Sequence, residues 1–237
     1  QAMQNLMLHD TLYTELDPIT MTWCATAQLR APYCDIQKNN PCLSAPQIAY
    51  NQRQQQRTGV RLLLQALLKK LAIVDILDES SFPYRLIHSQ YYVCFSHSSG
   101  SNKNATRMQN DIENSDNPYV KVAVILSRQR ASGIDIEVKE VKWQLAKRFY
   151  HPKELAILQD MPIIKRDNVI KWLWQIKESF IKIHQYTLAQ GLGMDYTTII
   201  PNLIKQSTDS FPLLTITDDN SGYRIAVIAS QQTVIVY

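Results

Sequence analysis

The sequence lacks the features that mark several large classes of protein. Glycine is scarce, with 6 residues in 237, and neither a P-loop nor a GxGxxG motif occurs, which excludes nucleotide binding by those glycine-rich loops. No apolar run approaches the roughly 18 residues that a membrane-spanning helix needs, and the chain does not open on a signal-peptide pattern. We therefore expect a cytoplasmic protein with no membrane partner.

Cysteine pairs and a large net charge are also missing. The 4 cysteines form no CxxC motif and have no histidine at zinc-finger spacing, so we expect reduced, partly buried thiols. The net charge is +4 with scattered basic residues, which does not favour nucleic acid as a partner. A mild positive excess suits a polyphosphate ligand or an acidic protein partner. The cysteines are Cys24, Cys34, Cys42 and Cys94.

Hydrophobic residues make up 45% of the chain and charged residues 19%, which is typical of soluble globular domains. Apolar periodicity predicts helices at 46–72, 145–150, 152–162 and 168–186, the last with Asp167 as its N-cap. Thr-rich and apolar runs predict strands at 19–28, 91–95, 120–126, 133–138, 198–200, 213–217, 223–229 and 233–236. Polar loops are expected at 30–45 and 99–117. An α+β architecture follows, because each half combines a long amphipathic helix with several strands.

Three carboxylates and a lysine are the strongest chemical signal. Asp135 and Glu137 are two apart in a predicted strand, so they point from the same face. Glu178 and Lys182 are four apart in a predicted helix and share one helix face. Taken separately, these pairs could be an acidic strand end and an exposed ion pair of about 0.2–0.5 kcal/mol. Together they suit a magnesium-bound pyrophosphate, whose metal prefers oxygen ligands.

The segment Ser96-His97-Ser98 places a hydroxyl beside an imidazole. Neighbouring residues on a strand point to opposite faces, so Ser96 and His97 are not expected to form a catalytic dyad. No GxSxG motif accompanies them. A histidine that contacts phosphate and a histidine satisfied by the core both remain open.

Read together, these segments resemble the 4′-phosphopantetheinyl transferase superfamily, in particular its monomeric surfactin-synthetase-activating type. The family pattern is an SHS segment, a GIDIE strand and a WxxKESxxK helix. Here they stand as Ser96 to Ser98, Gly133 to Glu137 and Trp174 to Lys182. Further likenesses are the Phe149-Tyr150-His151-Pro152-Lys153-Glu154 stretch, the Gly191-Leu192 turn and a fainter match through Arg57-Thr58.

The resemblance implies transfer of the phosphopantetheine arm of coenzyme A to a serine of an apo acyl or peptidyl carrier protein. Mg²⁺, with Mn²⁺ as the alternative, would be held on the pyrophosphate, and adenosine 3′,5′-bisphosphate would be released. The implied metal ligands are Asp135, Glu137 and Glu178. The implied catalytic groups are Glu178, which takes the serine proton directly or through a bound water, together with Lys182 and His97. The implied coenzyme contacts are Arg57, Thr58, Arg85, Ser96, His97 and Lys182.

The family fold implies two pseudo-symmetric α/β halves, each a small sheet packed on a long helix, with the boundary between residues 3–117 and 118–237. Where the family usually has Gly-Lys/Arg-Pro, this chain has Phe82-Pro83-Tyr84-Arg85, and Arg85 is expected to supply the charge. The pocket for the coenzyme's 3′-phosphate is left open among Arg30, Lys38 and Arg53. A monomer is expected.

Two other functions remain open at this point. A catalytically silent module could bind coenzyme A or carrier proteins, and a magnesium-dependent hydrolase could cleave pyrophosphates, because three carboxylates do not specify the acceptor. The carrier's pathway is also open.

Overall fold

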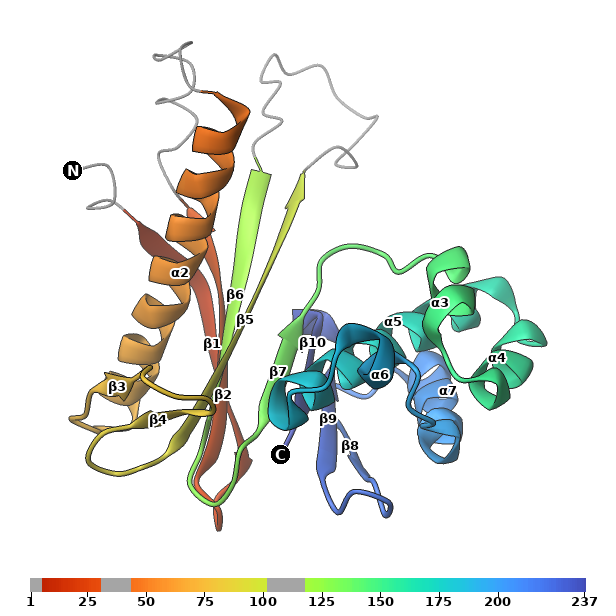
Figure 1. Cartoon of the computed structure of the whole chain (residues 1–237). Helices are drawn as coiled ribbons and strands as arrows, with labels where there is room; N and C mark the ends of the chain where they lie inside the picture. The colour runs from red at the N-terminus through yellow and green to blue at the C-terminus, as the bar shows by residue number, and fades with distance from the viewer. Residues whose placement is uncertain (1–5, 31–43, 102–117) are drawn as a thin grey trace.

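The computed structural model describes residues 6–30, 44–101 and 118–237. This part of the chain is a mixed α/β structure with two antiparallel sheets and six α-helices, in agreement with the predicted class. The larger sheet has the strand order β1-β2-β6-β5-β4-β3, and the smaller has β7-β10-β9-β8. Figure 1 shows the arrangement of these layers.

The element bounds are as follows. The larger sheet comprises β1 (Met7–Asp17), β2 (Thr22–Arg30), β3 (Leu77–Asp78), β4 (Tyr84–Leu86), β5 (Tyr92–Ser101) and β6 (Pro118–Ser127). The smaller sheet comprises β7 (Gly133–Ile136), β8 (Leu214–Thr217), β9 (Arg224–Ile228) and β10 (Thr233–Val236). The helices are α2 (Ala45–Lys70), α3 (Trp143–Phe149), α4 (Pro152–Gln159), α5 (Ile163–His184), α6 (Leu188–Leu192) and α7 (Ile200–Asp209), with 3-10 turns η1 (Thr197–Ile199) and η2 (Ala229–Gln231).

The layers follow the order helix, sheet, sheet, helices. The larger sheet lies between α2 and the smaller sheet, whose other face is covered by α5 and its neighbouring helices. Strand β6 shows why this arrangement forms. Its residues alternate, with Val124 facing α2 and Ile125 facing the smaller sheet, and both are buried. A strand that is buried on both faces has a nearly continuous apolar sequence, as β6 does.

A dry layer joins the two sheets. It contains short and branched side chains from both, which lets the sheets approach closely. The buried members are Cys24, Cys94, Ala123, Ile125, Ile134, Ile136, Ala226, Ile228, Ile235 and Tyr237. The thiols of Cys24 and Cys94 are free and buried, as predicted for reduced cysteines, whereas Cys34 and Cys42 lie outside the described residues.

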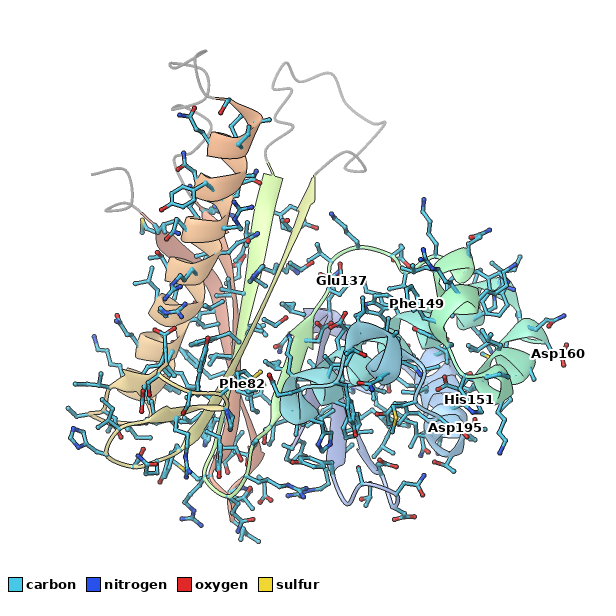
Figure 2. The ribbon with its side chains drawn as sticks, in the orientation of Figure 1. Phe82, Glu137, Phe149, His151, Asp160 and Asp195 are labelled. Carbon is cyan, nitrogen blue, oxygen red and sulfur yellow. The ribbon has the colours of Figure 1, made fainter. Side chains whose placement is uncertain are left out.

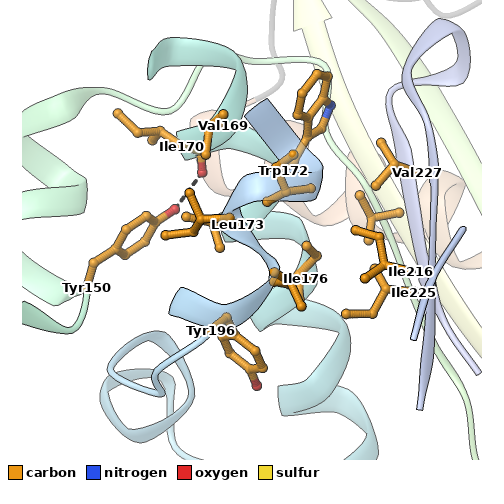
Figure 3. Packing of buried hydrophobic residues seen from close by; sticks show 14 of the residues in the cluster. Tyr150, Val169, Ile170, Trp172, Leu173, Ile176, Tyr196, Ile216, Ile225 and Val227 are labelled. Carbon is orange, nitrogen blue, oxygen red and sulfur yellow. Dashed lines mark hydrogen bonds between the residues drawn. The ribbon is translucent and has the colours of Figure 1, made fainter. Parts of the chain in front are cut away.

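The C-terminal core is built around α5. Its apolar positions Val169, Leu173, Ile176 and Phe180 are buried, and Ile183, at the same helical spacing, is half-buried. Figure 3 shows Val169, Leu173 and Ile176 packed among residues of the neighbouring strands and helices, with the Tyr150 hydroxyl donating to the Ile170 carbonyl at 2.6 Å. The long helix is therefore fixed in orientation by its own buried face.

The larger sheet extends past residue 117, where the sequence led us to place the boundary. Strand β6 follows that position, yet it is hydrogen-bonded between β2 and β5. The chain passes from one sheet to the other between Ser127 and Gly133. Strand β6 belongs to the larger sheet because it supplies apolar side chains to both faces of that sheet. The predicted boundary was placed at the end of a polar loop, and the position of that loop does not reveal this packing.

Several predicted elements need correction. Strand β1 was missed because it is an edge strand with mostly polar, half-exposed residues and a register shift near Asp10. The predicted strand at 198–200 is wrong: the segment is η1 followed by α7, with a proline in the first turn of α7. Asp167 is not an N-cap, because α5 already begins at Ile163, after Pro162. The true start was missed because Ile163 and Ile164, in the first turn, are apolar but exposed and do not continue the buried face of the helix.

Candidate functional site

Strand β7 and helix α5 approach each other closely at one point. A Cβ atom added to Gly133 would lie 2.2 Å from the backbone carbonyl oxygen of Ser179, so only glycine allows this contact. Ser179 is fully buried, and its hydroxyl donates to the Gln175 carbonyl at 2.8 Å. This contact sets the acidic strand against the helix face that carries Glu178 and Lys182.

The carboxylate of Asp135 lies at the centre of the site. The Lys182 ammonium is 3.7 Å from Asp135 Oδ1 and donates to the carbonyls of Ile134 at 2.6 Å and Phe95 at 3.3 Å. Asp135 Oδ2 is buried without a hydrogen-bond partner. Burial raises the pKa of Asp135 to about 7, with Lys182 opposing the shift and the charges of Glu178 and Glu137 adding to it. The site thus holds an under-compensated carboxylate.

Glu137 follows the end of β7 and is tied to β5. Its Oε1 accepts from the Ser98 hydroxyl at 3.1 Å and from the Lys139 amide at 2.9 Å. Ser96, two residues before Ser98 on β5, makes a similar contact with β7: its hydroxyl accepts a hydrogen bond from the Ile136 amide at 2.9 Å. Figure 2 shows Glu137 near the upper end of β7. Two serines of β5 therefore position the acidic strand.

Glu178 is half-buried on α5. Burial raises its pKa, Lys182 opposes that shift, and Glu137 adds to it. These mutual effects require the charges of Asp135, Glu137, Glu178 and Lys182 to lie near one another. A half-buried carboxylate with a raised pKa and an open side is suited to accept a proton.

The three carboxylates do not form a ready metal cluster. Within residues 6–30, 44–101 and 118–237, no group of three or more His, Cys, Asp or Glu side chains is arranged to hold a metal ion. The chemistry of the donors nevertheless fits a hard divalent cation, because Asp135 has an unpartnered oxygen and its neighbours are carboxylates. Glu137 would have to release Ser98 or bind through its second oxygen.

His97 and Ser96 point in opposite directions, as predicted. Ser96 is buried against β7 whereas His97 is exposed. Desolvation by the surrounding protein and the charge of Lys182 both lower the pKa of His97, so its imidazole is mostly neutral near pH 7. His97 therefore lies within electrostatic reach of the carboxylate site.

The other predicted coenzyme contacts lie on different elements. Arg57, on α2, is exposed and 3.7 Å from the carboxylate of Glu79, and Thr58 follows it on the same helix. Arg85 is engaged elsewhere: its guanidinium stacks on Tyr92, 4.2 Å from the ring centroid, and donates to the Gln90 carbonyl at 2.9 Å. Of the alternatives, Lys38 lies outside the described residues.

Comparison with known families found a match over part of the chain. Residues 131–228 match the model of the 4′-phosphopantetheinyl transferase superfamily (ACPS). The match covers less than half of the chain, and this part of the chain is similar to the superfamily. The match includes Asp135, Glu137, Glu178 and Lys182, and it leaves out the residues on α2 and β5. A comparison with curated proteins found no match. Within the described residues, no helix is long and apolar enough to cross a membrane.

The matched region contains a buried ion pair that the sequence did not reveal. Lys177 Nζ donates to Glu154 Oε1 at 2.7 Å and to the carbonyls of Leu192 and Met194 at 2.8 and 2.6 Å. Both side chains of the ion pair are fully buried. Glu154 also accepts from the amides of His151 and Tyr196. Although Lys177 adjoins Glu178, it points into the core and fixes α5 to α4 and to the segment after α6.

The cost of keeping Asp135 charged leads to a stability prediction. We expect Asp135→Asn to raise the free energy of unfolding of the metal-free protein by about 1–3 kcal/mol at pH 8, because it removes a buried charge that has one oxygen without a partner. The direction of the effect follows from the raised pKa of Asp135. Because the folded state binds the Asp135 proton more tightly than the unfolded state does, protonation of Asp135 stabilises the fold. This stabilisation is fully present below about pH 4 and is lost as the pH rises through about 7.

Urea unfolding with EDTA at pH 8 and pH 4 measures this effect. Asp160→Asn is the matched control, because Asp160 is exposed at the outer end of the helical layer, far from Glu137 in Figure 2. An Asp135→Asn protein that is less stable than the parent at pH 8 would contradict the account of an under-compensated carboxylate.

Proposed function

We propose that this protein transfers the 4′-phosphopantetheine arm of coenzyme A to a serine of an apo acyl or peptidyl carrier protein, in a magnesium-dependent reaction. The observation that carries the proposal is the superfamily match over residues 131–228, which spans the segments where Asp135, Glu178 and Lys182 come together. The SHS segment of β5, which lies before the match, supports the surfactin-synthetase-activating type within the superfamily.

In the proposed reaction, the carrier serine Oγ attacks the phosphorus next to the pantetheine. A new P–O bond forms, and the bond to the other phosphate of the pyrophosphate breaks. The released adenosine 3′,5′-bisphosphate keeps that bond's electron pair, and Glu178 takes the serine proton. The half-buried position and raised pKa of Glu178 support this role as a base.

Lys182 is suited to stabilise the charge that develops on the leaving group. Its ammonium is fixed by two backbone carbonyls and faces Asp135, so it needs little reorganisation during the reaction. His97 and Ser96, on opposite faces of β5, together with Arg57, Thr58 and Arg85, are proposed to contact the coenzyme. Ser96 would act through the β7 backbone that it already binds.

The proposed metal ligands are Asp135, Glu137 and Glu178. A bound Mg²⁺ or Mn²⁺ would neutralise charge on the pyrophosphate oxygens. The unpartnered Asp135 Oδ2 supports this assignment. The protein is further proposed to act in the cytoplasm as a monomer, with its two sheet-and-helix units forming related halves.

The test is carrier-dependent product release. The full chain, coenzyme A and Mg²⁺ are incubated with and without an apo carrier protein, and adenosine 3′,5′-bisphosphate is measured by chromatography. We expect release only with the carrier, one molecule for each carrier modified. Release without a carrier would indicate a hydrolase, and coenzyme binding without release would indicate a silent binding module; either outcome contradicts the proposal.

A further inference from the structure

Helix α2 presents two arginines, one turn apart, to the same carboxylate. Arg57 and Arg61 are four residues apart and therefore share a helix face. Their Nη2 atoms both approach Glu79 Oε1, Arg57 at 3.7 Å and Arg61 within hydrogen-bonding distance. Glu79 follows β3 in the connection to β4. Two cations thus converge on one anion.

The guanidinium of Arg61 is held in a fixed orientation. Its Nε donates to Glu79 Oε2 at 3.2 Å, its Nη2 donates to Oε1, and its Nη1 donates to the Arg57 carbonyl at 2.8 Å. The group also lies over the Phe95 ring, 5.4 Å from the centroid. The planar N–H donors of a guanidinium can bind a carboxylate or a phosphate through two parallel hydrogen bonds, and in this structure those of Arg61 bind Glu79.

This arrangement adjoins the proposed coenzyme site. Phe95 and His97 are two apart on β5 and face the same side of the sheet. Arg57 is largely exposed, with 63% of its side-chain area accessible, so it can reach a ligand in solution. Because two arginines face one glutamate, the cluster keeps a net positive charge that attracts anions.

Glu79 can leave this position without uncovering the core. Residues 79–82 are all exposed, and the Glu79 side chain is itself 31% exposed. Phe82, at the end of this stretch, is 45% exposed. Exposed ion pairs of this kind contribute little to stability, so displacement of Glu79 by a competing anion costs little free energy.

We propose that Glu79 occupies the place of a ligand phosphate: Arg57 and Arg61 form a phosphate-binding pair that Glu79 closes in the ligand-free protein. A phosphate group of the coenzyme then binds the arginine fork by displacing the carboxylate. Glu79 is a residue that sets coenzyme affinity, and Arg61 is a further contact beside Arg57. The inference rests on the proposed function, because it takes the ligand to be the coenzyme.

Titration calorimetry of the full chain with adenosine 3′,5′-bisphosphate tests the inference. We expect Glu79→Gln to lower the Kd about two- to fivefold, the range that an exposed ion pair allows. Arg61→Lys, which keeps the charge but loses the fork, raises the Kd. In the Arg61→Lys background, the effect of Glu79→Gln shrinks, because the two residues act on one interaction.

Glu15→Gln is the matched control, since Glu15 is exposed on β1 and the substitution removes the same charge. An equal gain in affinity from Glu15→Gln would overturn the inference by showing a general charge effect. An unchanged or raised Kd for Glu79→Gln would overturn it as well.

The carrier assay on the same preparations separates this inference from the proposed function. Unchanged bisphosphate affinity in Glu79→Gln, with normal carrier modification by the parent, rejects only the role of Glu79. Tighter bisphosphate binding by Glu79→Gln without carrier modification supports the phosphate pair and rejects the transferase. A parent protein that neither binds the bisphosphate nor modifies a carrier rejects both.

Discussion

Replacing Glu178 with glutamine is expected to lower kcat for carrier modification by about 10²–10⁴-fold, the usual contribution of a general base. Glutamine keeps the size of the side chain but cannot accept the serine proton or offer a charged oxygen to a metal. Folding should be preserved, because burial already disfavours the charged form of Glu178. Initial rates with saturating coenzyme A and carrier measure the effect.

Glu15→Gln serves as the control for this experiment, because Glu15 lies exposed on β1, away from the matched domain. Thermal unfolding of both variants excludes a trivial loss of structure. A well-folded Glu178→Gln protein with more than about a tenth of the parent rate would remove Glu178 from the role of base.

The second large effect is on stability. We expect Lys177→Met to reduce the free energy of unfolding by about 3–5 kcal/mol, because it leaves the carboxylate of Glu154 buried without its charged partner. The same change also removes the donor to the Leu192 and Met194 carbonyls. Urea unfolding at neutral pH measures the loss.

Lys182→Met is the matched control on the same helix, since the Lys182 side chain is 26% exposed and that of Lys177 is fully buried. Lys182→Met should lose activity with a much smaller loss of stability. The double variant Lys177→Met/Glu154→Leu should recover part of the stability, because it removes the unpaired charge. Equal urea midpoints for Lys177→Met and the parent would contradict the assigned role.

Periodicity predicted which groups of the candidate site share a face. A two-residue spacing on a strand and a four-residue spacing on a helix each put two groups on one face, and the structure brings Asp135 and Lys182 within 3.7 Å. The alternation that separates Ser96 from His97 follows from the same geometry. The shared faces and the alternation depend only on local backbone geometry, whereas the approach of β7 to α5 is a contact between distant segments.

The features that sequence reasoning missed depend on contacts between distant segments. Lys177 and Glu154 are 23 residues apart, and nothing in their local pattern distinguishes a buried pair from two surface charges. Arg61 and Glu79 are 18 residues apart. Arg61 had one available signal, its position one turn after Arg57. Ser98 had another, since it shares a strand face with Ser96 and could have been predicted to meet the acidic strand.

The most direct test is intact-protein mass spectrometry of an apo carrier incubated with this protein, coenzyme A and Mg²⁺. We predict a mass gain equal to one phosphopantetheine on the carrier, lost when EDTA is added and lost when Glu178→Gln replaces the parent. No mass gain on acyl or peptidyl carriers of several pathway types, from a folded protein that binds coenzyme A, would contradict the assignment as a transferase.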